Sequence, residues 1–426
     1  MGIQINGQTD TVTAIDGSLN VGGDVIIPGV LTYDDVTNID SIGVVTARSG
    51  VHVTSGSVGI GTDDPIGTNA LTDNTSILAV GIATVGALHV NGNAYPSLGP
   101  LSNRNIAING AMTVKQRGSS FTSLSGVSTY PADRFRFLNE YGTFDAVNSS
   151  TSPDGFSNSI RFDCTTANTS PAANDEIYVQ QLVEAQDLQQ LAYGSSAAKA
   201  ITVSFYVRSN KTGDYGFWVH MPDASRQYAT TYTISSADTW EYKTITIPGD
   251  SSGTINNDTG IGLNFRWYLG SGSSYSGTPA SAWEVADANA RTTTLNLADN
   301  TSNEWYLTGV QIEQGTGATP FEYRSFGDEL ARCQRYYVKS NSGLMGRFYN
   351  HGDVTRDIFF RIGLPVSLRD FNNSTTTAVG DISDGSNFSN WNYIQAGDPL
   401  GLLFRKNNIG AGGFVDINSF EVDNEL

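Results

Sequence analysis

The first hundred residues contain no Lys, Glu, Phe, Trp or Cys, and Arg48 is their only strongly basic residue. Gly, Val, Thr, Asp and Asn dominate instead. A segment with so few large side chains cannot bury a thick hydrophobic core by itself. Val and Ile nevertheless alternate with small polar residues over short runs, which is typical of short strands. The segment therefore predicts β structure that needs neighbouring chains.

The same region repeats loosely along its length. The run "LNVGGD" (19–24) resembles "LHVNGN" (88–93), and "GVVTARSGVHV" (43–53) aligns with "GIATVGALHV" (81–90) with one gap. Short β units that cannot close a core alone are stabilised by identical neighbours, and three chains around one axis would supply them. We expect residues 1–100 to form a homotrimeric β stalk, with a flexible linker as the alternative.

The charge balance excludes one large class of partner. The chain has 24 Lys and Arg against 42 Asp and Glu, a formal net charge of −18, so no basic patch is available for nucleic-acid phosphates. No run approaches the length of a membrane span, and the start, "MGIQINGQTD", lacks the basic and apolar segments of a signal peptide. No cofactor is expected, because no Gly-rich phosphate-binding motif occurs.

Cysteine and histidine usage indicates neither a disulfide framework nor a metal centre. Cys164 and Cys333 are far apart in sequence, which favours two buried free thiols. The histidines, at 52, 89, 220 and 351, lack metal-ligand spacing. The stretch "PGDSSGTINNDTG" (248–260) could hold Ca²⁺, although solvated turns are the simpler interpretation.

Beyond residue 100 the chain predicts two further regions. "YPSLGPLSN" (95–103) is typical of a joint, and a β-sandwich ending in a short helix is expected over 101–337. Its evidence is a series of short runs that alternate apolar and polar residues between Gly-, Ser- and Asn-rich loops. These runs lie at 159–164, 199–209, 214–221, 240–248, 262–269 and 303–314. A small C-terminal β domain is expected over 338–426.

Two helical segments interrupt the strands. A helical turn is expected near 184–191, stopped by Gly194. The other helix should begin after Ser325, since Ser325 with Asp328 resembles a capping box. Leu330, Cys333 and Tyr337 then share one face and should be buried.

The strand before the second helix carries its own expectations. In "YLTGVQIEQG" (306–315), Val310 and Ile312 should lie on one face of the strand. Gln311 and Glu313 should lie on the other. "FEYR" (321–324) is expected to add the closing edge of the sandwich.

Five segments follow one another in an order that a known family shares. They are "NIAINGAMTVKQRGSSFT" (105–122), "YPADRFRF" (130–137), "AITVSFYVRS" (200–209), "DTWEYKTITIPGD" (238–250) and "TGVQIEQGTGATPFEYRS" (308–325), and "ELARCQRYY" (329–337) comes after them. This order resembles a jelly-roll domain common in phage tail fibres, which is itself similar to carbohydrate-binding jelly rolls. The resemblance implies the fold and, more weakly, glycan binding, because one fold hosts many functions.

The two ends of the chain carry resemblances of the same kind. "GSVGIGTDDP" (56–65) is similar to units in the stalks of trimeric phage fibres, and "TYDDVTNIDSIGVVTARSGVHV" (32–53) to segments of cyanophage structural proteins. "FEVDNEL" (420–426) resembles the end of a tip domain that often follows such jelly rolls. Within this region, "RDIFFRIGLPVSLRDF" (356–371) predicts a strand pair with Pro365 at an edge or bulge.

Residues that could carry catalysis are scattered. Glu284, Asp287, Glu304 and Glu313 fall within one domain, and a glycosidase needs two carboxylates that flank a sugar, but any acidic chain offers such pairs by chance. No GxSxG motif occurs, and His220 in "FWVHM" is expected to be an ordinary strand residue. The chain is therefore expected not to be an enzyme.

Aromatic residues are the stronger candidates, because exposed rings stack on the apolar faces of sugars. Trp240 and Trp305 lie in segments that match the family and are expected in the core. The candidate glycan-binding residues are Tyr215 and Trp218, Trp267, Tyr268 and Tyr275 in the sandwich, and Tyr349, Trp391 and Tyr393 in the C-terminal region. A wholly structural role for these rings is the alternative.

Together these features predict an all-β homotrimeric fibre or spike on a virion. The N-terminal region would attach to tail or adaptor proteins, and the sandwich and tip would bind a host surface glycan or protein receptor without turnover. The rivals are an architectural head or tail decoration protein and a virion-associated polysaccharide depolymerase.

Overall fold

The computed structural model describes residues 88–90, 93–95, 102–286, 291 and 295–340, followed by a series of shorter segments. These segments are 346–349, 356–369, 375–381, 387–389, 392–394, 401–409, 414–417 and 419–425. The chain divides into two compact units, Met1–Ile82 and Ala83–Leu426. The first unit, and with it most of the predicted trimeric stalk, lies outside the described residues.

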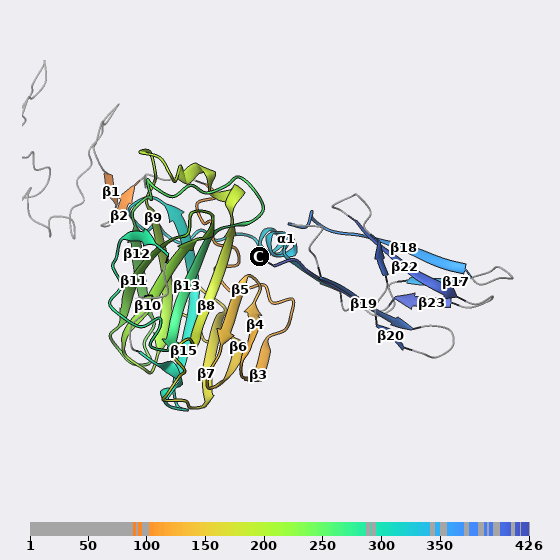
Figure 1. Cartoon of the computed structure of the whole chain (residues 1–426), viewed down its shortest axis with the longest axis horizontal. Helices are drawn as coiled ribbons and strands as arrows, with labels where there is room; N and C mark the ends of the chain where they lie inside the picture. Colours follow the sequence, from red (N-terminus) through yellow and green to blue (C-terminus); the bar gives the residue numbers. More distant parts are fainter. Residues whose placement is uncertain are drawn as a thin grey trace, which may run out of the picture. The chain divides into compact units, whose positions relative to one another are not determined.

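The second unit begins with a hairpin and continues into a two-layer β-sandwich. The hairpin pairs β1 (Leu88–Val90) with β2 (Asn93–Tyr95). One layer has seven antiparallel strands in the order β14 (Trp283–Val285), β11 (Arg226–Ile234), β10 (Gly213–Met221), β13 (Ile261–Ser271), β8 (Glu176–Glu184), β5 (Phe135–Asn139) and β4 (Val127–Ala132). The other has six, in the order β12 (Glu241–Ile247), β9 (Ile201–Ser209), β15 (Glu304–Gln314), β7 (Ser159–Thr166), β6 (Thr143–Ser149) and β3 (Ser120–Leu124). The all-β, jelly-roll-type sandwich expected from the sequence is confirmed (Figure 1).

Alternation along several strands directs side chains into the core between the layers. In β6, for example, buried and half-buried residues alternate at every position, as a strand with one core-facing side requires. Phe137 from one layer stacks on Phe162 from the other with ring centroids 4.2 Å apart, and Phe162 stacks on Trp305 at 6.1 Å. Trp305 is fully buried, as predicted, but Trp240 is only half-buried against Tyr306. Each such ring contributes about 1.5–3 kcal/mol through burial.

The strand β15 keeps the predicted faces but changes register in its middle. Val310 and Ile312 point into the core and are fully buried. Gln311 and Glu313 point to the other side, where they are buried as well, under the loop that follows. Between Thr308 and Gln311 the pairing with β9 shifts, and Gly309 has a φ of +62°. Such a left-handed glycine is the usual way to accommodate a β-bulge.

The two helical segments form where the sequence predicted them. The 3₁₀ helix η1 (Ala185–Leu191) ends at Ala192, which has a left-handed conformation, two residues before Gly194. The helix α1 (Phe326–Gln334) is capped by Ser325, whose hydroxyl accepts a hydrogen bond from the Asp328 amide at 3.2 Å. The capping prediction is therefore confirmed.

The buried face of α1 differs in part from the prediction. Cys333 and Tyr337 are buried as predicted, although Tyr337 lies past the helix, in β16 (Tyr337–Ser340), and Leu330 is only half-buried. Glu329 takes the inner position instead, because its carboxylate accepts a hydrogen bond from Arg324 and another from the Asn109 amide. These two partners satisfy the buried carboxylate of Glu329, a residue for which no burial was predicted.

The described segments of the C-terminal region form three small sheets. A four-stranded sheet has the order β16, β24 (Ser419–Asp423), β19 (Thr375–Asp381) and β20 (Asn387–Ser389). The others pair β17 (Gly346–Tyr349) with β23 (Phe414–Ile417), and β18 (Arg356–Gly363) with β22 (Gly401–Ile409) and β21 (Asn392–Ile394). The strand pair predicted within 356–371 is wrong: β18 pairs with the distant β22, and Pro365 lies in a bend after the strand.

An ion network joins this region to the sandwich. Glu425 forms ion pairs with Arg134 and, at 3.3 Å, with Arg117, which also contacts Asp423 at 3.1 Å. The neighbouring Asn424 amide donates to the Tyr336 carbonyl at 2.7 Å. The side chains of Arg134 and Glu425 are 2 % and 8 % exposed, and Asn424 as a whole is 2 % exposed. The acidic end of the chain is thus held against the sandwich by largely desolvated charge pairs.

Two further expectations concerned the cysteines and membrane-spanning segments. Cys164 and Cys333 are buried free thiols, as predicted. No helix among the described residues is long and apolar enough to cross a bilayer.

Candidate functional site

Five aromatic side chains form a continuous strip on the outer face of the six-stranded sheet. Tyr242 packs on Tyr206 with ring centroids 5.0 Å apart, and Tyr206 packs on Phe156 at 5.5 Å. Phe156 in turn contacts Phe321 at 5.0 Å and Tyr323 at 5.6 Å. The two ends of the strip are the most accessible, with Tyr242 47 % and Tyr323 61 % exposed.

Strand pairing places the first two rings side by side. Tyr206 on β9 and Tyr242 on β12 are direct partners across the antiparallel pair. Their neighbours Phe205 and Ile245 face the core, so alternation sends both tyrosines outward. Cross-strand aromatic pairs of this kind support the sheet and present a ring surface to solvent at the same time.

Gly309 makes room for the middle of the strip. A Cβ at this position would lie 2.8 Å from Phe156 Cζ and 2.9 Å from Tyr206 Cδ2, which is closer than real Cβ atoms come. Gly309 therefore adopts the left-handed backbone of the bulge in β15 and, because it has no side chain, leaves room for the rings of Phe156 and Tyr206. The glycine belongs to the floor of the site although it has no side chain.

The last two rings are carried by the loop after β15, which buried polar groups hold in place. Glu313 accepts hydrogen bonds from the Thr319 amide at 2.8 Å and the Thr319 hydroxyl at 2.7 Å. Gln311 accepts from the Glu322 amide at 2.7 Å. Tyr323 is further tied to the turn before β7, because its hydroxyl donates to the Gly155 carbonyl at 3.0 Å. Residues 321–324 are therefore a pinned loop and not the edge strand predicted from "FEYR".

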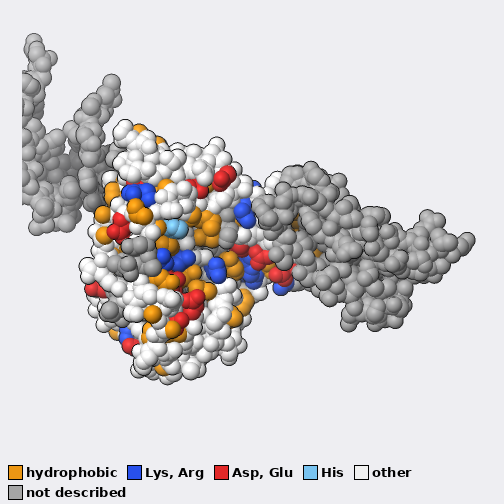
Figure 2. Space-filling view, viewed as in Figure 1, with side chains coloured by type: hydrophobic (Ala, Val, Ile, Leu, Met, Phe, Trp, Pro, Cys, Tyr) orange, Lys and Arg blue, Asp and Glu red, His pale blue; other side chains and the backbone are white. Residues whose placement is uncertain are grey.

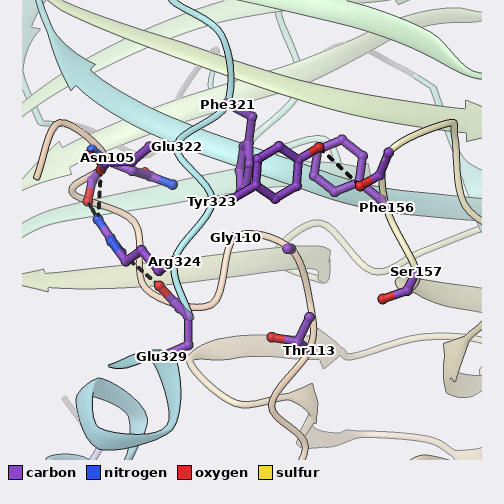
Figure 3. A pocket seen from close by; sticks show the side chains of 12 residues that line it. Asn105, Gly110, Thr113, Phe156, Ser157, Phe321, Glu322, Tyr323, Arg324 and Glu329 are labelled. Carbon is purple, nitrogen blue, oxygen red and sulfur yellow. Dashed lines mark hydrogen bonds and ion pairs between the residues drawn. The ribbon is translucent and has the colours of Figure 1, made fainter. Parts of the chain in front are cut away.

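Two cavities flank the strip and share three of its rings. One, of about 670 Å³, lies over β9 and β12 and reaches Ser204, Thr244 and Thr319. The other, of about 430 Å³, extends toward Asn105 and α1. Phe156, Phe321 and Tyr323 line both cavities, and Figure 3 shows them in the smaller one. We call the five rings and the two cavities together the aromatic groove.

The smaller cavity has a charged floor. Arg324 donates to Glu329 at 2.9 Å and lies 3.4 Å from Glu322, and it also donates to the carbonyls of Asn105 and Ala107 (Figure 3). The pKa of Glu322 is lowered: burial by itself would raise it, but hydrogen bonds from the Asn105 and Arg104 amides and the charge of Arg324 outweigh burial. Arg324, Glu322 and Glu329 are thus all charged and paired with one another on one side of the smaller cavity, and the aromatic rings line its other side.

Four of the predicted glycan-binding rings are buried in the structure. Tyr215 and Trp267 belong to the main core and are fully buried, so their expected exposure is wrong. Trp218 and Tyr268 point to the outer face of the seven-stranded sheet, as alternation required of Tyr268, but they too are at most 2 % exposed. Tyr275 is half-buried. The pattern of alternation predicts the face of a sheet, and it cannot reveal whether a loop covers that face.

The outer face of the seven-stranded sheet carries a compact polar cluster instead of open rings. Arg266 lies over Tyr178 and Trp218, and Tyr268 donates to Glu176 at 2.6 Å. Figure 2 shows basic, acidic and hydrophobic side chains gathered on one face of the sandwich. His220 stacks on Trp218, and burial together with nearby Arg266 lowers the pKa of His220 to about 4. His220 is therefore neutral at pH 7 and serves as a strand residue, as expected.

The remaining predicted candidates divide between described and undescribed residues. Tyr349 and Tyr393 lie in β17 and β21, but their side chains, and Trp391 altogether, are outside the described residues. In the stretch 248–260, Asp250 pairs with Arg226 and Asp258 accepts from the Gly260 amide. Among the residues that the structure describes, no three His, Cys, Asp or Glu side chains come together as a metal site.

Of the carboxylates considered for catalysis, Glu304 and Glu313 are both described by the structure and lie far apart. Glu304 and Glu313 lie at opposite ends of β15, roughly 25–30 Å apart at the usual rise per strand residue. Glu284 accepts a hydrogen bond from Gln227 on the seven-stranded sheet. Asp287 is outside the described residues. Two carboxylates must lie within about 10 Å to flank one glycosidic bond, so Glu304 and Glu313 cannot act as such a pair.

Sequence analysis missed all five rings of the aromatic groove. Tyr206 and Tyr242 do alternate with core residues in "AITVSFYVRS" and "DTWEYKTITIPGD", a signal that could have placed them on an outer face. Phe156, Phe321 and Tyr323 come from loops that lie more than 150 residues apart in the chain. Only the tertiary fold brings them together, so no local pattern could have found the site.

Comparisons with known proteins give distant structural likenesses. No family model matches the chain, and no curated protein does. Solved structures with a similar fold include the enzymatically active domain of tailspike protein 4 of bacteriophage CBA120, at 9% identity and a TM-score of 0.26, over 49% of this chain and 21% of that one.

Two carbohydrate-binding modules from Clostridium thermocellum are also similar. The C-terminal family 22 module of Xyn10B is 11% identical over 52% of this chain and 99% of its own, with a TM-score of 0.26. The family 11 module, solved with a mixed-linked tetrasaccharide, is 12% identical over 47% of this chain and 98% of its own, with a TM-score of 0.23. The structural neighbours of this β-sandwich thus include a phage tailspike domain and carbohydrate-binding modules, and the function has to be argued from the aromatic groove itself.

Proposed function

We propose that this chain is a fibre-type attachment protein that binds a surface glycan through the aromatic groove without turnover. The observation that carries the proposal is the continuous strip of five rings, with accessible ends, that lies between two cavities. The apolar faces of sugar rings stack on such surfaces, and nearby hydroxyl and amide groups meet the sugar hydroxyls.

The chemistry of the groove supports binding more than bond cleavage. Glu322 and Glu329, the two carboxylates on the floor, are both engaged with Arg324 and with backbone amides. A general acid must instead hold a proton near the scissile bond, which requires a raised pKa. The lowered pKa of Glu322 does not suit that role.

The fibre part of the proposal comes from the rest of the chain. A homotrimeric stalk over residues 1–100 would join the protein to tail or adaptor proteins of a virion and would present three copies of the groove. Linking weak sites raises avidity with no new contact. Light scattering tests the assembly: a mass of three chains of 45.5 kDa is expected, and a stable monomer would contradict the stalk.

Binding to host cells and to an immobilised glycan panel tests the function. The full chain should label cells and bind a subset of glycans, whereas the Tyr323→Ala and Tyr242→Ala variants should each bind about ten-fold more weakly, the equivalent of ~1.4 kcal/mol per lost ring contact. Val285→Ala removes a side chain that is 71 % exposed on the other sheet and serves as the matched control. Equal binding by all variants would contradict the site.

The same experiment separates the rival functions. Steady release of reducing ends from a bound polysaccharide would mark a depolymerase. Failure of the full chain to label any cell or glycan would favour an architectural protein that binds only virion components. Either outcome would replace the proposal.

A further inference from the structure

The aromatic groove contains an unequal set of charges. Among the described residues that line its two cavities, Arg324 is the only basic side chain, against the carboxylates of Asp154, Glu322 and Glu329. The larger cavity has no basic side chain in its lining and one carboxylate, that of Asp154. A ligand that enters the groove therefore meets a net negative site.

The single cation of the groove is already committed. Both terminal nitrogens of Arg324 donate to carboxylate or carbonyl oxygens of Glu322, Glu329, Asn105 and Ala107. The side chain is 8 % exposed, and its Nε, which has no hydrogen-bond partner, is itself buried from solvent. A ligand carboxylate or sulfate could pair with this guanidinium only by displacing protein groups. Leaving a buried charge unpaired costs several kcal/mol.

Apart from the exposed carboxylate of Asp154, the groups that remain available to a ligand are neutral. Thr244 and Ser157 offer exposed hydroxyls at the walls, and the strip between them consists of rings. Hydroxyl groups and aromatic faces recognise the alternating polar and apolar surface of an uncharged sugar. An anionic sugar would meet like charge both at Asp154 and in the field of a chain of net charge −18.

We infer that the aromatic groove takes a neutral glycan and rejects glycans that carry uronate, sialate or sulfate groups. The inference rests on the proposed function, and it names the class of ligand for the same site. It follows from the charges and hydroxyls that line the groove and from the engagement of Arg324.

A panel of paired oligosaccharides tests the inference. Each pair shares linkage and length, and one member carries uronate in place of the neutral hexose. The full chain should bind neutral members only, in a manner that depends on Tyr323 and changes little with salt. Binding of acidic members that is lost in Tyr323→Ala would overturn the inference and keep the proposed function. Failure to bind any member would overturn the proposed function itself.

A charge variant sharpens the result. Thr244 is exposed on β12 and lines the larger cavity, so Thr244→Lys adds one cation to the groove. This variant should gain roughly ten-fold or more in affinity for the acidic members and lose that gain in high salt. Val285→Lys adds the same charge on the opposite sheet and should gain nothing. Equal behaviour of the two variants would show that the lining charge does not set specificity.

Discussion

At the scale of single residues, Gly309 shows how a position without a side chain shapes the groove. Its φ of +62° and the rings of Phe156 and Tyr206 beside it leave no space for a Cβ. Gly317 lies in the loop over the larger cavity, where a Cβ would meet nothing within 4 Å. The two glycines can therefore be compared directly, because an added Cβ would clash with the rings at Gly309 and would contact nothing at Gly317.

Gly309→Ala should displace Phe156 and Tyr206 and weaken glycan binding at least ten-fold, with a loss of stability of about 1–2 kcal/mol from the strained backbone. Gly317→Ala should leave both properties within experimental error. Calorimetric titration with a bound glycan and urea unfolding measure the two effects. Unchanged binding by Gly309→Ala would show that the two rings take no part in recognition.

For single residues, the sequence predicts the face of a strand but not whether a side chain on that face is exposed. Neighbouring Trp267 and Tyr268 face opposite sides of β13, as alternation predicts. The burial of Tyr268 could not be predicted from its own strand, because it depends on contacts with the neighbouring strand β8, where Tyr268 packs on Tyr178 and donates to Glu176. Exposure is a property of the assembled surface, and a single strand does not contain it.

At the scale of elements, the end of β8 is fixed to the segment after α1 by one carboxylate. Glu184 is fully buried and accepts hydrogen bonds from Arg335 at 2.6 and 2.8 Å and from the Tyr336 hydroxyl. Burial by itself would raise the pKa of Glu184, but the bonds from Arg335 and Tyr336 lower it. The charged form of Glu184 is thus the form that holds the two elements together.

Glu184→Gln should lower the free energy of unfolding by about 2–4 kcal/mol at neutral pH, because Arg335 loses its partner. The folded pKa lies below the unfolded value of about 4.3. The stabilisation is therefore fully present above that pH and is lost as pH falls through the folded pKa. Urea unfolding followed by tryptophan fluorescence at several pH values measures this. A difference that does not shrink in acid would contradict the assigned cause, and Asp187→Asn, at an exposed neighbour, is the control.

Elements also differ in how well the sequence foretold them. Strands with one core face, such as β7 and β12, were predicted from their alternation of apolar and polar residues. "FEYR" looked like another strand, but Glu313 and Gln311 hold that segment as a loop through hydrogen bonds. Hydrogen bonds with residues outside the segment therefore set its conformation. In the same way, the distant strand β22, and not a neighbour in sequence, pairs with β18.

At the scale of the whole molecule, three segments that looked unrelated in sequence meet at one junction. "YPADRFRF" supplies Arg134, "ELARCQRYY" supplies Tyr336, and "FEVDNEL" supplies Glu425. Arg134 pairs with Glu425 and lies over the Tyr336 ring, 3.4 Å from its centroid. The junction fixes β24 and β16 against the sandwich and so anchors the start of the C-terminal region.

Glu425→Ala should release this junction without unfolding the sandwich. The loss of a buried ion pair costs about 3 kcal/mol, so amide exchange in β16 and β24 should rise roughly a hundred-fold. Glu421→Ala removes the 3.7 Å ion pair of Glu421 with Lys339, in which Glu421 is 44% exposed, and it should change exchange little. Similar exchange in both variants would contradict the junction.

The central claim is that a glycan binds along the aromatic groove of the six-stranded sheet. A structure of the full chain with an oligosaccharide selected from the glycan panel tests it most directly. We predict sugar rings against Tyr242, Tyr206 and Tyr323, between β12 and the loop after β15. A sugar bound on the outer face of the seven-stranded sheet, or only in the C-terminal region, would contradict the account.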